Sequence, residues 1–177
     1  MTYYDQIYEL AVDNHYLIST QDAADAGIPP VELPKLAQRG KLENISRGLY
    51  RLTRRVPHQN DAFATAVARV GKGAYLFGES VIAMLGLAPT NPAYICVATP
   101  NRTRRRLPPS IRLKRHDEDD VPTVYDGIPS QSAANAIRSA RETMMDDRLQ
   151  EAAERAREEG YLSRTEYASL KEEMGWA

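Results

Sequence analysis

Residues 39–55 read RGKLENISRGLYRLTRR, and this stretch decides how the N-terminal part of the sequence folds. Six Lys or Arg residues are spaced there by Leu, Ile and Tyr. The segment reads as two short strands with a turn near Ser46-Arg47-Gly48. Its apolar residues indicate a packed element, and its cations indicate a surface that meets a polyanion.

Three helices are expected before the hairpin, and the first two lie in residues 3–27. Residues 3–14 have apolar positions at helical spacing. A short Ala-rich helix follows, with Ser19 or Thr20 as its N-cap and Gly27 at its end, where glycine accepts a left-handed conformation.

A third short helix lies directly before the hairpin. It is expected to begin close to Leu33 and to close at Gly40, with Pro34 in the first turn, where a missing N–H is tolerated. Two helices joined by a tight turn and followed by a β-hairpin predict a winged helix-turn-helix over residues 1–57.

In such a fold the second helix of the pair enters the major groove and the hairpin lies along the DNA backbone. Base reading then falls to Lys35, Gln38 and Arg39, whose donors can meet groove edges. The remaining predicted DNA-binding residues are Lys41, Arg47, Arg51, Arg54 and Arg55, the last four expected to be free for phosphates. With about six phosphates neutralised, log affinity falls against log salt with a slope near −5.

Residues 58–177 are expected to form a mixed α/β domain ending in long helices, so the chain as a whole belongs to the α+β class. Short strands are expected around "AYLFG", "YICVAT", "SIRLKRH" and "PTVYDGIP". One long helix is expected over 131–160. The capping box at 163–166 opens a last helix that reaches about Glu173.

A second basic cluster lies at 102–116, which holds seven Lys or Arg residues and no acidic residue before the acidic run at 117–120. Its first four cations are spaced as in a loop: Arg102, Arg104, Arg105 and Arg106. The cluster is either a solvated loop neutralised by the acidic run or a contact for nucleic acid or an acidic partner.

The composition excludes several classes of protein. The net charge is −1 with 42% hydrophobic residues, which is typical of a globular domain and not of a wholly basic nucleic-acid binder. No signal peptide and no bilayer-length apolar run is visible, so a cytoplasmic protein without membrane contact is expected.

No enzyme emerges from the motifs. Cys96 reads as a small buried hydrophobe, and one Cys with three scattered His is not a metal set. The GKG at 71–73 lacks the spacing of a phosphate loop. We therefore expect no catalytic residue, no metal and no cofactor.

The sequence resembles the AbiE-type antitoxins (AbiEi-like) of bacterial type IV toxin-antitoxin systems. The resemblance covers roughly residues 5–141, and "RGLYRL", "ESVIAMLGLAPTNP" and "DGIP" before a helix carry it. It implies a non-enzymatic repressor whose winged helix binds inverted repeats in double-stranded DNA of its own promoter. It also implies that the part after residue 57 counters a cognate nucleotidyltransferase toxin, with the cluster of 102–106 as a candidate contact.

An alternative stays open at this point. The winged helix could no longer read DNA, and the chain could act as a protein-binding module that neutralises a toxin by direct contact. The two interpretations differ at Arg39, Arg47 and Arg51, because only the first expects operator binding to weaken when they are replaced.

Overall fold

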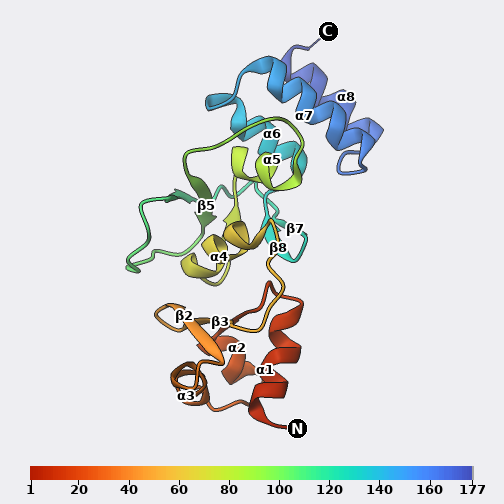
Figure 1. Cartoon of the computed structure of the whole chain (residues 1–177). Helices are drawn as coiled ribbons and strands as arrows, with labels where there is room; N and C mark the ends of the chain where they lie inside the picture. Colours follow the sequence, from red (N-terminus) through yellow and green to blue (C-terminus); the bar gives the residue numbers. More distant parts are fainter. Residues whose placement is uncertain (177) are drawn as a thin grey trace. The chain divides into compact units, whose positions relative to one another are not determined.

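The computed structural model describes residues 1–176 and divides into two compact units, Met1–Lys72 and Gly73–Ala177 (Figure 1). Both units combine helices with a sheet, so the expected α+β class is confirmed. Helix α4 (Asp61–Val70) belongs to the first of these compact units. The division of labour expected from the sequence, with DNA binding in 1–57 and antitoxin function in 58–177, stays a prediction.

The N-terminal unit contains three helices and three strands before α4. Thr2 and Ser19 form capping boxes with Asp5 and Asp22, which explains where the first two helices begin. The elements are α1 (Tyr3–Val12), β1 (Leu17–Ser19), α2 (Thr20–Asp25), α3 (Glu32–Gln38), β2 (Leu42–Ser46) and β3 (Leu49–Leu52).

The turn between α2 and α3 gives the unit a helix-turn-helix-like form. Gly27 has a φ of +74°, the left-handed conformation expected at this helix end. The N–H of Ile28 donates to the carbonyl of Ala23 at 2.8 Å, and the Ile28 side chain is buried. Pro34 lies in the first turn of α3, as the sequence predicts, so it interrupts no helical hydrogen bond.

The three strands form an antiparallel sheet in the order β1-β3-β2. Strand β1 is not predicted by the sequence, because three residues are too few to show alternation. It exists because Leu17 and Ile18, both buried, pair with the distant strand β3. The sheet and the helices enclose one core: Ile7, Ala11, Ile18, Ala23, Ile28, Leu33, Leu36, Leu42 and Leu52.

The C-terminal unit has a mixed five-stranded sheet in the order β6-β5-β4-β8-β7. Its strands are β4 (Tyr75–Leu76), β5 (Ile95–Thr99), β6 (Ile111–Arg115), β7 (Thr123–Tyr125) and β8 (Ile128–Ser130). Cys96 in β5 is only partly buried, which corrects the expectation of a buried residue, and desolvation there raises the pKa of its thiol.

Helix α5 (Glu79–Leu85) follows β4, and the chain after β8 forms α6 (Ala133–Ser139), a 3-10 turn (Ala140–Glu142), α7 (Asp146–Glu158) and α8 (Arg164–Met174). The single long helix expected over 131–160 is therefore wrong. Continuing the buried face of α6 at helical spacing reaches Asp147 and Glu151, which are charged, whereas the buried face of α7 contains Leu149 and Ala152. The helix is interrupted at Met145, whose backbone is extended. Helix α7 begins directly after it, with its buried residues at a different helical phase from those of α6.

The helices of this unit share one core with α5. Its members include Ile82, Leu87, Ile137, Leu149, Leu170 and Trp176. Two side-chain contacts fasten the last helix: Arg138 pairs with Glu173 at 2.6 Å, and the Trp176 indole donates to Asp146 at 2.8 Å. The capping box predicted at Ser163 and Glu166 is confirmed.

Candidate nucleic-acid interface

Helix α3 presents three of the predicted DNA-binding residues to solvent. Leu33 and Leu36 are buried in the core, and this fixes the opposite face of the helix outward. Lys35, Gln38 and Arg39 lie exposed on that outward face and at its end. The Lys35 ammonium is 3.2 Å from the Glu32 carboxylate, one turn away, so its charge is partly neutralised.

Arg47 lies at the turn of the β2–β3 hairpin, as the sequence predicts. Gly48 follows it with a φ of +72°, and a Cβ there would meet the Thr20 hydroxyl at 3.0 Å. The N–H of Thr20 donates to the Gly48 carbonyl at 2.8 Å. The hairpin turn is thereby tied to the first residue of α2, and Arg47 is held beside the helix-turn-helix-like segment.

Arg51 is not free, which corrects the sequence expectation. It lies in β3 opposite Glu43 of β2, and their guanidinium and carboxylate groups are 3.1 Å apart. Only 18% of the Arg51 side chain is exposed, and its Nε is buried without a hydrogen-bond partner among the described residues. Its charge is therefore paired within the hairpin itself.

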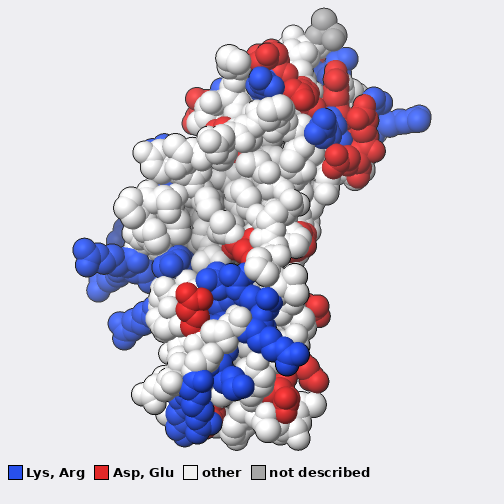
Figure 2. Space-filling model, in the orientation of Figure 1, with Lys and Arg blue, Asp and Glu red and all other residues white. Residues whose placement is uncertain are grey.

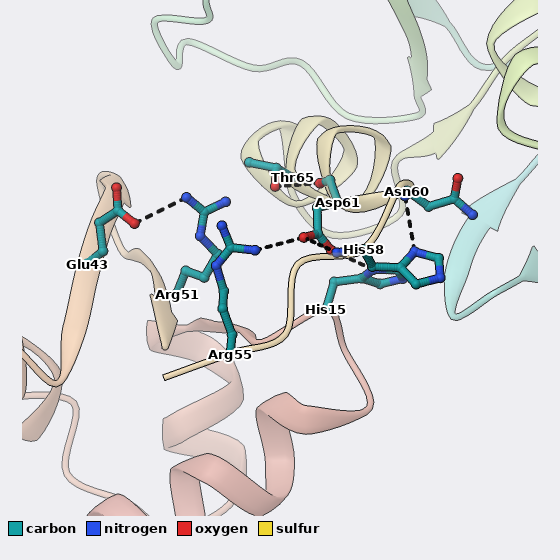
Figure 3. Close-up of polar contacts among 8 residues, drawn as sticks. All are labelled: His15, Glu43, Arg51, Arg55, His58, Asn60, Asp61 and Thr65. Carbon is teal, nitrogen blue, oxygen red and sulfur yellow. Dashed lines mark hydrogen bonds and ion pairs between the residues drawn. The ribbon is translucent and has the colours of Figure 1, made fainter. Parts of the chain in front are cut away.

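Arg55 is likewise engaged, in a polar cluster around Asp61 at the start of α4 (Figure 3). The Asp61 carboxylate accepts from Arg55 at 2.8 Å and from the His58 backbone N–H at 2.9 Å, and it lies 3.2 Å from His15 Nδ1. Desolvation raises the pKa of Asp61, but the hydrogen bonds from His58 and His15 and the charge of Arg55 outweigh it, so the pKa is lowered. The cluster fastens α4 to the unit and withdraws Arg55 from the surface.

The remaining cations of the unit are more accessible. Lys41 is exposed, with its ammonium 5.6 Å from the centre of the Tyr4 ring. The side chains of Arg39, Arg47 and Arg54 are exposed and have no hydrogen bond or ion pair within residues 1–176. Figure 2 shows Lys and Arg side chains gathered on one face of this unit. The predicted site thus separates into engaged cations and free ones.

The second basic cluster lies in the C-terminal unit, and its first four arginines are in a loop, as predicted. Arg102, Arg104, Arg105 and Arg106 are all exposed. The following strand β6 is exposed from Arg112 to Arg115. The solvated-loop interpretation and the contact interpretation both accommodate these positions.

A polar network in the C-terminal unit is absent from the sequence predictions. Asp120, 8% exposed, accepts hydrogen bonds from the Tyr75 hydroxyl at 3.1 Å, the Gln131 amide at 3.0 Å and the Asn135 amide at 3.1 Å. His116 Nδ1 lies 2.8 Å from the same hydroxyl. Burial and the negative charge of Asp120 raise the pKa of Tyr75, so the phenol keeps its proton.

His116, Asp120, Gln131 and Asn135 line an open cleft of about 780 Å³, which is bordered by Lys114, Asp117, Glu118 and Glu142. The donors and the carboxylate of the polar network satisfy one another, so the network joins β4, α6 and the 117–120 loop. No local sequence pattern predicts the network, because Tyr75 and Asp120 are far apart in the chain and only the fold brings them together.

The length and polarity of the helices bear on membrane contact. No helix among residues 1–176 is both long and apolar enough to cross a bilayer.

The geometry of the N-terminal unit defines a class of protein: a helix-turn-helix-like module with exposed cations on α3 and on the β2–β3 hairpin. Residues 5–53 match the family model described as "Transcriptional regulator, AbiEi antitoxin". This match runs from within α1 to just past β3 and confirms the resemblance to AbiEi-type antitoxins.

No curated protein matches the chain. Among solved structures, the chain is similar to the crystal structure of the RV2827C protein from Mycobacterium tuberculosis, with 16% identity and a TM-score of 0.40, over 96% of this chain and 81% of that chain.

Proposed function

We propose that this chain is a DNA-binding antitoxin of the type IV kind that represses its own operon and counters a nucleotidyltransferase toxin. The observation that carries the proposal is the family match over 5–53, together with free arginines at the end of α3 and at the hairpin turn. In this proposal the N-terminal unit is a winged helix-turn-helix, with α3 in the major groove and the β2–β3 hairpin as the wing.

The contacts are assigned from accessibility. Gln38 and Arg39 on α3, with Lys35 beside them, read base edges, and Arg47, Arg54 and Lys41 bind phosphates. Arg51 and Arg55 act indirectly, because their ion pairs hold the hairpin and the start of α4 in place. With about three free cations, the slope of log affinity against log salt is closer to −3 than to −5.

A mobility-shift titration on DNA from upstream of this chain's own gene tests the proposal. It uses a scrambled competitor of equal length and two salt concentrations. A shift that survives the competitor and weakens in Arg39→Ala and Arg47→Ala is the expected result. The exposed Arg164 at the start of α8 supplies a matched control, Arg164→Ala, which should bind like the parent chain.

One observation favours the second candidate, a protein-binding module without DNA reading. Two of the four arginines expected to be free for phosphates are engaged with carboxylates of the same unit. Binding that disappears with competitor and is unchanged by Arg39→Ala would support this candidate over the repressor.

A further inference from the structure

Strand β6 forms one edge of the C-terminal sheet, and no strand of residues 1–176 lies on its outer side. It pairs in parallel with β5 over Ile111 to Arg115. The hydrogen bonds from Ile95 N–H to the Ser110 carbonyl and from His116 N–H to the Thr99 carbonyl fix which residues bond inward. Because backbone groups of successive residues point to opposite sides of a strand, Arg112 and Lys114 bond to β5, and the backbone N–H of Leu113 and Arg115 faces outward.

Most side chains of β6 are exposed to solvent. Four consecutive residues, from Arg112 to Arg115, are exposed, and Leu113 is 39% exposed. Arg112 lies over the Tyr94 ring at 4.1 Å, and Lys114 lies over the Phe77 ring at 4.3 Å. A ring holds a cation in place without neutralising it, so both charges remain available on one face of the edge.

The charge of this edge selects the partner. Residues 102–116 contain seven cations and no acidic residue, so a second copy of β6 cannot pair with the first without placing like charges opposite each other. Cations on an edge strand also block non-specific pairing. A strand with carboxylates at alternate positions meets neither obstacle, because its acids lie across from Arg112 and Lys114 while its backbone completes the ladder.

We propose that β6 is a docking edge for an extended acidic segment of a partner protein, which adds to the sheet as a further strand. The arginines of 102–106 attract the segment, and the outward backbone of Leu113 and Arg115 binds it. This inference rests on the proposed antitoxin function and deepens it, because it names the surface through which the C-terminal unit contacts a protein. A strand explains the free backbone edge and the exposed Leu113, which phosphate binding does not use.

The test separates backbone pairing from simple charge attraction. The probe is a short synthetic peptide that alternates glutamate with valine, compared with the same peptide N-methylated at alternate amides. Binding to the full chain is measured by fluorescence anisotropy. Leu113→Pro removes the outward N–H at a position where an edge strand tolerates proline, and Leu113→Ala is the matched control that keeps it.

We expect the unmethylated peptide to bind the parent chain, and Leu113→Pro and N-methylation each to weaken binding about tenfold or more. Leu113→Ala should stay within about twofold, because every backbone group remains. The double variant Arg112→Glu, Lys114→Glu should also lose binding, whereas Arg164→Glu should not. If Leu113→Pro fails to fold in a thermal melt, the N-methylated peptide on the parent chain decides.

Three outcomes would overturn the inference. The first is no binding of the peptide, and the second is equal binding of the N-methylated peptide. The third is binding of a DNA oligonucleotide that is weakened by the charge-reversal variant and not by Leu113→Pro. The last outcome identifies a phosphate surface instead. The same variants are run in the operator mobility shift. Operator binding that persists while peptide binding fails leaves the proposed function standing without the docking edge.

Discussion

Asp61 in the N-terminal unit is partly buried and Asp120 in the C-terminal unit is buried, and different kinds of hydrogen-bond donor surround them. Asp61 is held by Arg55, by His15 and by a backbone N–H. Asp120 is held by a phenol and two amides, which are neutral. The first arrangement neutralises the charge of Arg55 and the second neutralises no cation. A count of cations in the sequence therefore overstates the positive charge on the surface of the N-terminal unit.

The largest effect is expected from Asp61→Asn, which leaves Arg55 and His15 without the carboxylate. The free energy of unfolding of the N-terminal unit should fall by about 2 kcal/mol at neutral pH. Hydrogen exchange of peptides from α1 and β3 measures this loss. The exposed Glu9 of α1 provides the control, Glu9→Gln, which should change little.

The pH dependence of that loss follows from the lowered pKa of Asp61. A carboxyl group whose pKa is lower in the folded state contributes its full stability above the unfolded pKa, about 4, and loses it as pH falls through the folded value. The difference between the parent chain and Asp61→Asn should therefore shrink below about pH 4. A difference that stays constant down to the lowest accessible pH would contradict the ionic role.

A smaller effect is expected from Tyr75→Phe, which removes one neutral donor from Asp120 and the contact with His116. The free energy of unfolding of the C-terminal unit should fall by about 1 kcal/mol. Trp176, the one tryptophan of the chain, lies in the core of this unit and reports its unfolding in urea by fluorescence. Tyr94→Phe is the matched control, because Tyr94 is 43% exposed. A loss equal to that of Asp61→Asn would remove the contrast between ionic and neutral partners.

The smallest effect concerns the engaged and free arginines. Arg47→Ala should reduce the salt slope of operator binding by about one if Arg47 binds a phosphate as proposed. Arg55→Ala should leave the slope unchanged, because its guanidinium already pairs with Asp61. Both are measured by anisotropy with operator DNA over a range of salt, at a temperature where each variant is folded. Equal changes in the two slopes would show that the pair with Asp61 opens on binding.

Much of the N-terminal unit could be predicted from its sequence, since the signals are local. The capping residue Ser19, the left-handed Gly27 and the turn near Gly48 each act on their own neighbours, and each is found where expected. Strand β1 could not be predicted, because its pairing with β3 joins residues far apart in the chain.

The candidate site was predicted less completely. The positions of Arg39 and Arg47 on the surface follow from local patterns, whereas the engagement of Arg51 depends on the register of two strands. The interruption of the helix at Met145 could not be predicted, because every residue around it is compatible with a helix. Only a shift in the spacing of the buried apolar residues marks it. The edge position of β6 depends on strand order, which the sequence does not encode locally.

The central position of β3 in its sheet has a consequence for synthesis on the ribosome. Strand β3 pairs with both β1 and β2, so neither neighbour has its complete partner until Leu52 has left the exit tunnel. From that residue onward the nascent chain holds all three strands, and Asp61 fastens α4 a few residues later. The C-terminal sheet must wait for β8, which pairs with β4. The helix-turn-helix-like unit can therefore fold first, while the rest of its own chain is still being translated.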